Sequence, residues 1–183
     1  MTKTNLSKFN NSWYHPGGNA IKRLCWYFTN AVWINSAFPI NGIKLFLLRL
    51  YGAKIGNGVV IKPHVNIKYP WKLEVGNDVW IGEYVWIDNL GEVKMEDNVC
   101  VSQGALLLCG NHNYKKEIFD LIVGDITLEQ GVWIGAKATV CPGVTCKSHS
   151  VLAVGSVATT DLDTYSIYQG NPAKKIRERK IDA

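Results

Sequence analysis

The sequence predicts an all-β core in which a short repeat coils into a solenoid, preceded by helices. Two observations support this prediction. The segments that begin at Ile55, Val75 and Met95 resemble one another and start 20 residues apart. After an interruption, apolar residues recur at strict intervals of six, at Leu128, Ile134, Val140, Cys146, Leu152 and Ala158. A six-residue apolar period fits neither an α-helix nor an alternating strand.

Six residues suit one side of a triangular coil, in which a short strand is followed by a tight turn. Gly or Asn can adopt a positive φ at such a turn. Each coil stacks its aliphatic residue on that of the next, so several coils share one core. The first three coils show the same spacing, at Ile55, Ile61, Ile67, Val75, Ile81, Ile87, Met95, Val101 and Leu107. We place this repeat domain at residues 55–160.

Two helices are expected in the segment before the repeat, residues 1–54. The first runs from about Ala20 to Ile34 after the turn at Gly17-Gly18-Asn19, with Asn19 as its N-cap. It is apolar on more than one face, so it requires cover by the solenoid, by another subunit or by a bilayer interface. Asn41 is expected to cap the second helix. The apolar stripes are Ile21, Leu24, Cys25, Phe28 and Val32 in the first helix and Ile43, Phe46, Leu47 and Leu50 in the second.

Residues 161–183 are expected to leave the solenoid and to end in a short basic helix from Lys174 to about Lys180. Asn171 is the predicted N-cap and Pro172 the first helical residue. The basic cluster here has three open interpretations: a site for a phosphate-bearing ligand, a contact with a phospholipid surface, or a solvated helix end.

The bulk properties indicate the compartment. The chain has 183 residues, a formal charge of +5 and five cysteines without a CxxC pair. Such an odd, unpatterned set is typical of a reducing compartment. The polar start lacks the apolar region of a signal peptide, and no uncharged apolar run reaches the roughly 18 residues of a membrane span. We therefore expect a cytoplasmic protein, with peripheral contact at the inner face of the membrane as an open alternative.

The interruption of the repeat, between Leu106 and Asp125, is where we expect the chemistry. His112 closes the third coil, and an insertion at about residues 113–125 follows it. Functional sites tend to be built on irregular excursions from a rigid scaffold. The alternative is that His112 is a loop residue without a function. The other histidines lie in the irregular start (His15) or at repeat positions that usually face solvent (His64 and His149).

The repeat resembles the left-handed parallel β-helix of the hexapeptide-repeat family, over about Ile55 to Thr160. The string Cys109-Gly110-Asn111-His112-Asn113-Tyr114 and the later Val132-Trp133-Ile134-Gly135-Ala136 resemble the galactoside, maltose and xenobiotic acetyltransferases. Trp86-Ile87-Asp88-Asn89-Leu90 and the aromatic N-terminal helices are more similar still to the exopolysaccharide O-acetyltransferases of the colanic acid type.

This resemblance implies an acetyl-CoA-dependent O-acetyltransferase that acts on a sugar hydroxyl of an exopolysaccharide or its precursor. His112 would be the general base, and the hydroxyl oxygen would attack the thioester directly. A histidine base suits such a weak nucleophile at neutral pH and typically contributes about 10²–10⁴-fold. A backbone N–H is the expected oxyanion donor. No cysteine is implicated as a nucleophile.

The resemblance also assigns the cofactor contacts. It places the pantetheine arm beside Trp133 and Ala136, the rest of the channel along Val154, Thr159 and Thr160, and the phosphates near Lys174 and Arg177.

On the acceptor side, the polar positions of the galactoside enzymes fall on Gly82 and Leu90, whose side chains cannot hydrogen-bond a sugar. This argues against a simple galactoside acceptor. Asp88 and Asn89, one coil before His112, are the expected substitutes. An ordinary turn residue is the alternative for Asp88.

The same family implies a homotrimer whose clefts lie between subunits. A carbonic-anhydrase-like metal site requires three converging histidines. No metal is expected here, because the residue five positions after His112 is Glu117 rather than a histidine. No nucleic-acid partner is expected, because the basic tail has no aromatic platform near it. A non-catalytic scaffold that binds a glycan or a protein is the alternative, and it predicts that His112 is dispensable.

Overall fold

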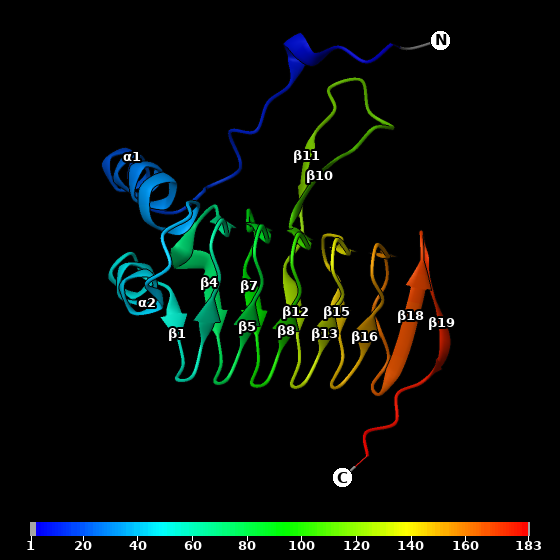
Figure 1. Ribbon diagram of the computed structural model, residues 1–183. Helices are drawn as coiled ribbons and strands as arrows, with labels where there is room; N and C mark the ends of the chain where they lie inside the picture. The colour runs from blue at the N-terminus through cyan, green and yellow to red at the C-terminus, as the bar shows by residue number, and fades with distance from the viewer. Residues whose placement is uncertain (1–2, 183) are drawn as a thin grey trace.

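The computed structural model describes residues 3–182 and shows a parallel β-helix with helices at one end (Figure 1). Each coil contributes one short strand to each of three sheets. The first sheet contains β1 (Lys54–Ile55), β4 (Leu73–Val75), β7 (Val93–Met95), β12 (Ile126–Leu128) and β15 (Thr145–Cys146). The second contains β2 (Val60–Ile61), β5 (Trp80–Ile81), β8 (Cys100–Val101), β13 (Trp133–Ile134), β16 (Val151–Leu152), β18 (Ser166–Gly170) and β19 (Ala173–Glu178). The third contains β3 (Asn66–Ile67), β6 (Trp86–Asp88), β9 (Leu106–Leu108), β14 (Thr139–Val140) and β17 (Val157–Ala158).

The core is a stack of the predicted hexad residues. Along the second sheet, parallel pairing sets Ile61, Ile81, Val101, Ile134 and Leu152 above one another, and all five are buried. Burial of one aliphatic side chain per side of each coil makes a continuous core. The predicted left-handed parallel β-helix is therefore confirmed.

Two helices lie against the first coil, at the β1 end of the solenoid (Figure 1). They are α1 (Ala20–Thr29), which continues into a π-helical turn η2 (Asn30–Ile34), and α2 (Asn41–Leu50). Single 3₁₀ turns, η1 (Leu6–Lys8) and η3 (Pro70–Lys72), complete the helical elements. The side chain of Asn19 accepts from the backbone N–H of Lys22, as the predicted N-cap.

Asn41 does not cap α2, contrary to the prediction. It is the first residue of the helix, after Ile40, and its side chain points to the solenoid. There its amide donates to the carbonyl of Val59 and accepts from the N–H of Ile61, both at 2.8 Å. The backbone groups at the open edge of the first coil have no further strand to pair with. The Asn41 side chain satisfies these groups rather than the N–H groups at the helix end.

Other polar side chains of the two helices bind the same edge. Lys44 is buried, and its ammonium donates to the carbonyl of Lys62 at 2.9 Å. Burial lowers the pKa of this lysine. Arg49 donates to the carbonyls of Ile55 and Gly56, and the Trp26 indole to that of Ile67. The helices thus bind the first coil through these polar side chains and through the buried Trp26, Ile34 and Leu48, while most of both predicted apolar stripes faces solvent.

The predicted basic helix at the C-terminus, from Lys174 to about Lys180, is wrong. Ala173–Glu178 form β19, which pairs antiparallel with β18 after a turn at Asn171 and Pro172. Asn-Pro fits a turn as well as a helix start. The edge of β18 offered backbone partners that a short isolated helix would not have had.

The interruption of the repeat is a β-hairpin. Strands β10 (Gly110–His112) and β11 (Leu121–Val123) pair antiparallel and project from the solenoid (Figure 1). The N–H of Gly124 donates to the carbonyl of Cys109 at 2.9 Å, which closes the base of the hairpin. Within residues 3–182, no helix is long and apolar enough to cross a bilayer.

Candidate active site

His112 is held at the end of β10 by the hairpin itself. Its ring stacks on that of Phe119, with centroids 4.5 Å apart and an interplanar angle of 8°. Its Nδ1 lies 3.0 Å from the carbonyl oxygen of Phe119. Because a carbonyl oxygen can only accept, this hydrogen bond requires a proton on Nδ1. The neutral ring then has its lone pair on Nε2, which is the form that a general base needs.

The N-terminal segment holds the hairpin from its other side. The Phe9 ring lies 5.7 Å from that of His112. The N–H of Asn5 donates to the carbonyl of Glu117 at 2.8 Å, and Lys8 pairs with the Glu117 carboxylate at the same distance. The histidine is therefore positioned by two segments that lie about a hundred residues apart in the chain.

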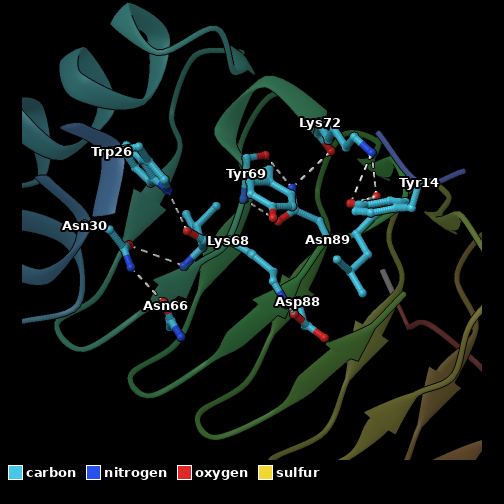
Figure 2. A network of polar contacts seen from close by, with 11 residues as sticks. Tyr14, Trp26, Asn30, Asn66, Lys68, Tyr69, Lys72, Asp88 and Asn89 are labelled. Atoms are coloured by element: carbon cyan, nitrogen blue, oxygen red, sulfur yellow. Dashed lines mark hydrogen bonds and ion pairs between the residues drawn. The ribbon is translucent and has the colours of Figure 1, made fainter. Parts of the chain in front are cut away.

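Asp88 lies beside the root of the hairpin. A Cβ built on Gly110 would be 3.9 Å from its Oδ2. Gly110 and His112 are two residues apart in β10, so they project to the same face of the strand. The Asp88 carboxylate therefore lies on the face of β10 that carries the His112 side chain. Asp88 also pairs with Lys68 at 2.8 Å and is largely buried (Figure 2).

Asn89 has a different environment. It is fully buried, and its amide donates to the carbonyls of Tyr69 and Lys72 and accepts from the N–H of Tyr69, at 2.6, 3.2 and 2.9 Å (Figure 2). These three hydrogen bonds fix one corner of the coil that presents Asp88. The side chain has little capacity left for a ligand.

Two further residues join this corner, and neither was predicted. The Tyr14 hydroxyl donates to the carbonyl of Leu90 at 2.8 Å, and the Lys72 ammonium donates to the same oxygen (Figure 2). Burial, reinforced by Tyr69 and Asp88, raises the pKa of the Tyr14 phenol. No periodicity marks residues 3–18, so the sequence carried no signal for this contact or for the one made by Phe9.

Several of the expected cofactor contacts line one groove, with a volume of about 620 Å³, over the second sheet. Trp133 and Val154 are 46% and 69% exposed there, and Ala136 and Arg177 complete the predicted set. Arg179 lines it too, although we counted it only as part of the basic cluster. Apolar walls with two guanidinium groups suit a ligand that has a long neutral arm and phosphates.

Three expected cofactor residues do not line this groove. Thr159 and Thr160 are exposed after β17, and Lys174 is exposed on β19 opposite Gln169. His112 is not among the residues that line this groove. The single chain therefore presents the base and the groove as separate parts.

Two of the cysteines lie buried in the solenoid. Burial raises the pKa of the Cys109 and Cys146 thiols to about 12, which disfavours the nucleophilic thiolate. Among residues 3–182, no group of three or more His, Cys, Asp or Glu side chains is placed to hold a metal ion.

Comparison with known proteins connects this architecture to an enzyme class. No protein-family model matches the chain. Its sequence is 37% identical over 164 residues to the putative colanic acid biosynthesis acetyltransferase WcaF of Escherichia coli, an alignment that covers 89% of this chain and 90% of that protein.

Solved structures agree with the sequence comparison. A galactoside acetyltransferase in complex with coenzyme A superposes with a TM-score of 0.79 at 25% identity, over 87% of this chain and 82% of that one. A hexapeptide-repeat acetyltransferase of Vibrio cholerae complexed with acetyl coenzyme A has the same TM-score at 21% identity, over 88% of each chain. The protein is thus an acetyltransferase of the hexapeptide-repeat class. Within that class, the chain belongs to the family of the colanic acid biosynthesis acetyltransferases.

Proposed function

We propose that the protein transfers the acetyl group of acetyl-CoA to a sugar hydroxyl of an exopolysaccharide or its precursor, with His112 as the general base. The observation that carries this proposal is the hydrogen bond between Nδ1 of His112 and the carbonyl of Phe119, 3.0 Å long. It orients the ring and leaves the lone pair of Nε2 for the substrate.

In the proposed step, Nε2 takes the hydroxyl proton as the sugar oxygen bonds to the thioester carbon. The carbonyl oxygen becomes a tetrahedral oxyanion, for which a backbone N–H is the expected donor. When the intermediate collapses, the C–S bond breaks and the imidazolium returns its proton to the leaving thiolate. The ester and CoA are released, and the histidine is neutral again.

The groove over the second sheet is the proposed site of acetyl-CoA. Trp133, Ala136 and Val154 would contact the pantetheine arm, and Arg177 the phosphates, with Arg179 beside it. Guanidinium groups bind phosphate with two parallel hydrogen bonds, which favours this end for the nucleotide.

Thr159, Thr160 and Lys174 lie outside the groove of one chain, so their proposed contacts depend on a second subunit. We propose a homotrimer in which the His112 hairpin of one subunit faces the groove of its neighbour. The separation of base and groove within one chain supports this arrangement, because a cyclic assembly brings different parts of identical chains together.

On the acceptor side, we propose that Asp88 accepts a hydrogen bond from the sugar and that Asn89 acts by holding the coil that presents Asp88. The position of Asp88 beside the root of β10 supports its role, and the three internal hydrogen bonds of Asn89 support the second. We also propose that the enzyme works at the inner face of a membrane, where lipid-linked glycan precursors would be accessible.

The test compares His112→Asn with a matched control, His64→Asn. His64 also stacks on an aromatic ring, that of Tyr84, but lies on another coil, and its φ of 60° suits asparagine. We expect both variants to bind acetyl-CoA like the wild type in calorimetry. Thiol release with a panel of glycans should fall about 10²–10⁴-fold in the His112 variant alone.

Retained turnover in His112→Asn would refute the base assignment. Failure of the wild type to bind acetyl-CoA would refute the transferase proposal for this chain and favour a non-catalytic glycan- or protein-binding scaffold.

A further inference from the structure

The two N-terminal helices carry a second set of apolar residues on the side that faces away from the protein. Ile21, Leu24, Phe28 and Val32 follow one face of α1 and η2, and their exposed fractions are 73%, 59%, 59% and 57%. These positions have the spacing of an amphipathic stripe that normally faces a core. Here the stripe has no cover within residues 3–182.

The second helix repeats the arrangement. Phe46 and Leu50 are 63% and 65% exposed, and Ile43 lies on the same face. The buried side of α2 includes Lys44, which binds the first coil. We define the outward apolar residues of both helices as the helical apolar surface: Ile21, Leu24, Phe28, Val32, Ile43, Phe46 and Leu50. Exposed apolar side chains that gather on one side of a protein mark an interaction site.

The charge on the two helices has one sign. Residues 20–34 and 41–50 contain four basic residues, Lys22, Arg23, Lys44 and Arg49, and no Asp or Glu. Lys22 and Arg23 lie on α1, Arg49 lies on α2, and none of the three forms a salt bridge with another described residue. A partner of the helical apolar surface should therefore combine apolar groups with negative charge.

We propose that the helical apolar surface docks on an anionic membrane, with the apolar side chains inserted at the boundary between headgroups and acyl chains. An amphipathic helix parallel to the bilayer buries its apolar face to this depth, and nearby basic residues attract the acidic lipids. No described helix can span the bilayer, so the contact is interfacial. A second copy of the chain is the poorer fit, because face-to-face contact would bring two basic surfaces together.

The proposed docking orients the enzyme. Both helices lie at the β1 end of the solenoid, so the membrane would lie against this end, and β18 and β19 would extend away from it (Figure 1). This contact is independent of the acetyl-transfer step. Its failure would remove the proposed location at the membrane and leave the proposed acetyl transfer unaffected.

The test is flotation of the full-length protein with vesicles of phosphatidylcholine alone, or with about one third phosphatidylglycerol. The wild type should float with the anionic vesicles only, and less at high salt. In a Phe28→Gln/Phe46→Gln double variant, partition should weaken by about tenfold or more. Both side chains are exposed, so the fold should persist, and calorimetry should show unchanged acetyl-CoA binding.

The matched control is Tyr114→Gln/Ile176→Gln, which removes two side chains of 75% and 52% exposure on the hairpin and on β19. This control should float like the wild type. Equal flotation of the Phe28/Phe46 variant would overturn the proposal, as would a wild type that ignores anionic vesicles. Concentration-dependent self-association that the double variant abolishes would also overturn it and assign the surface to a second copy.

Discussion

At the scale of single residues, the structure explains how the hairpin fixes the tautomer and the ring plane of a histidine. The carbonyl of Phe119 selects the tautomer of His112, and the Phe119 ring fixes its plane. The sequence predicted His112 from its place at the interruption. It could not predict Phe119 or Phe9, because both lie in irregular segments without a repeating pattern. The sequence also predicted Asn89 as an acceptor-side residue, but spacing could not reveal that its amide is already hydrogen-bonded within the coil.

This arrangement predicts that Phe119 is a positioning residue. Phe119→Asn keeps the backbone carbonyl, tolerates the φ of 53° and removes the stacked ring. We expect kcat to fall by about tenfold or more, because a misplaced base is costly, with little change in acetyl-CoA affinity. Steady-state kinetics and calorimetry would check this. Tyr84→Asn is the control, since Tyr84 has a similar φ and stacks on His64 instead; equal losses in both variants would contradict the positioning role.

At the scale of elements, periodicity predicted what would form but not which way it would face. The hexads specified the stacked coils because each coil has an identical neighbour to bury against. The helical stripes were predicted from their spacing, but most of each faces outward, because the opposite side of each helix, with Trp26, Ile34 and Leu48, packs on the first coil together with the polar side chains. The C-terminal helix failed for a related reason. Residues 173–178 gained backbone partners on β18 that local sequence could not reveal.

The binding of α2 to the open edge of the first coil can be tested by substitutions at two adjacent residues. Asn41→Ala removes two hydrogen bonds from the edge of the first coil, so the free energy of unfolding should fall by about 1–3 kcal/mol. Gly42→Ala should raise it by up to about 1 kcal/mol, because Gly42 is helical and a Cβ there meets open space. Denaturant titration would measure both free energies of unfolding. A loss of stability in Gly42→Ala would show that the start of α2 is strained.

At the scale of the whole molecule, the proposed trimer would bring the proposed base of one chain to the proposed cofactor groove of its neighbour. This predicts complementation between two inactive variants. When His112→Asn and Trp133→Ala chains are refolded together, about one site in four of a randomly mixed cyclic trimer should receive both intact residues. Acetyl transfer should recover to a comparable fraction of the wild-type rate.

The control is a mixture of His112→Asn with the His112→Asn/Trp133→Ala double variant, which should stay inactive. Light scattering should give the mass of three chains for the wild type. A monomer with full activity would refute the shared site.

The closed base of the β10–β11 hairpin has an evolutionary consequence. The hydrogen bond from Gly124 to Cys109 joins the two ends of the excursion, and β12 then continues the ladder of β7 in register. Codons for the hairpin can accordingly be lost, gained or exchanged without shifting a coil. Selection can therefore diversify the wall beside His112 while the solenoid is inherited unchanged.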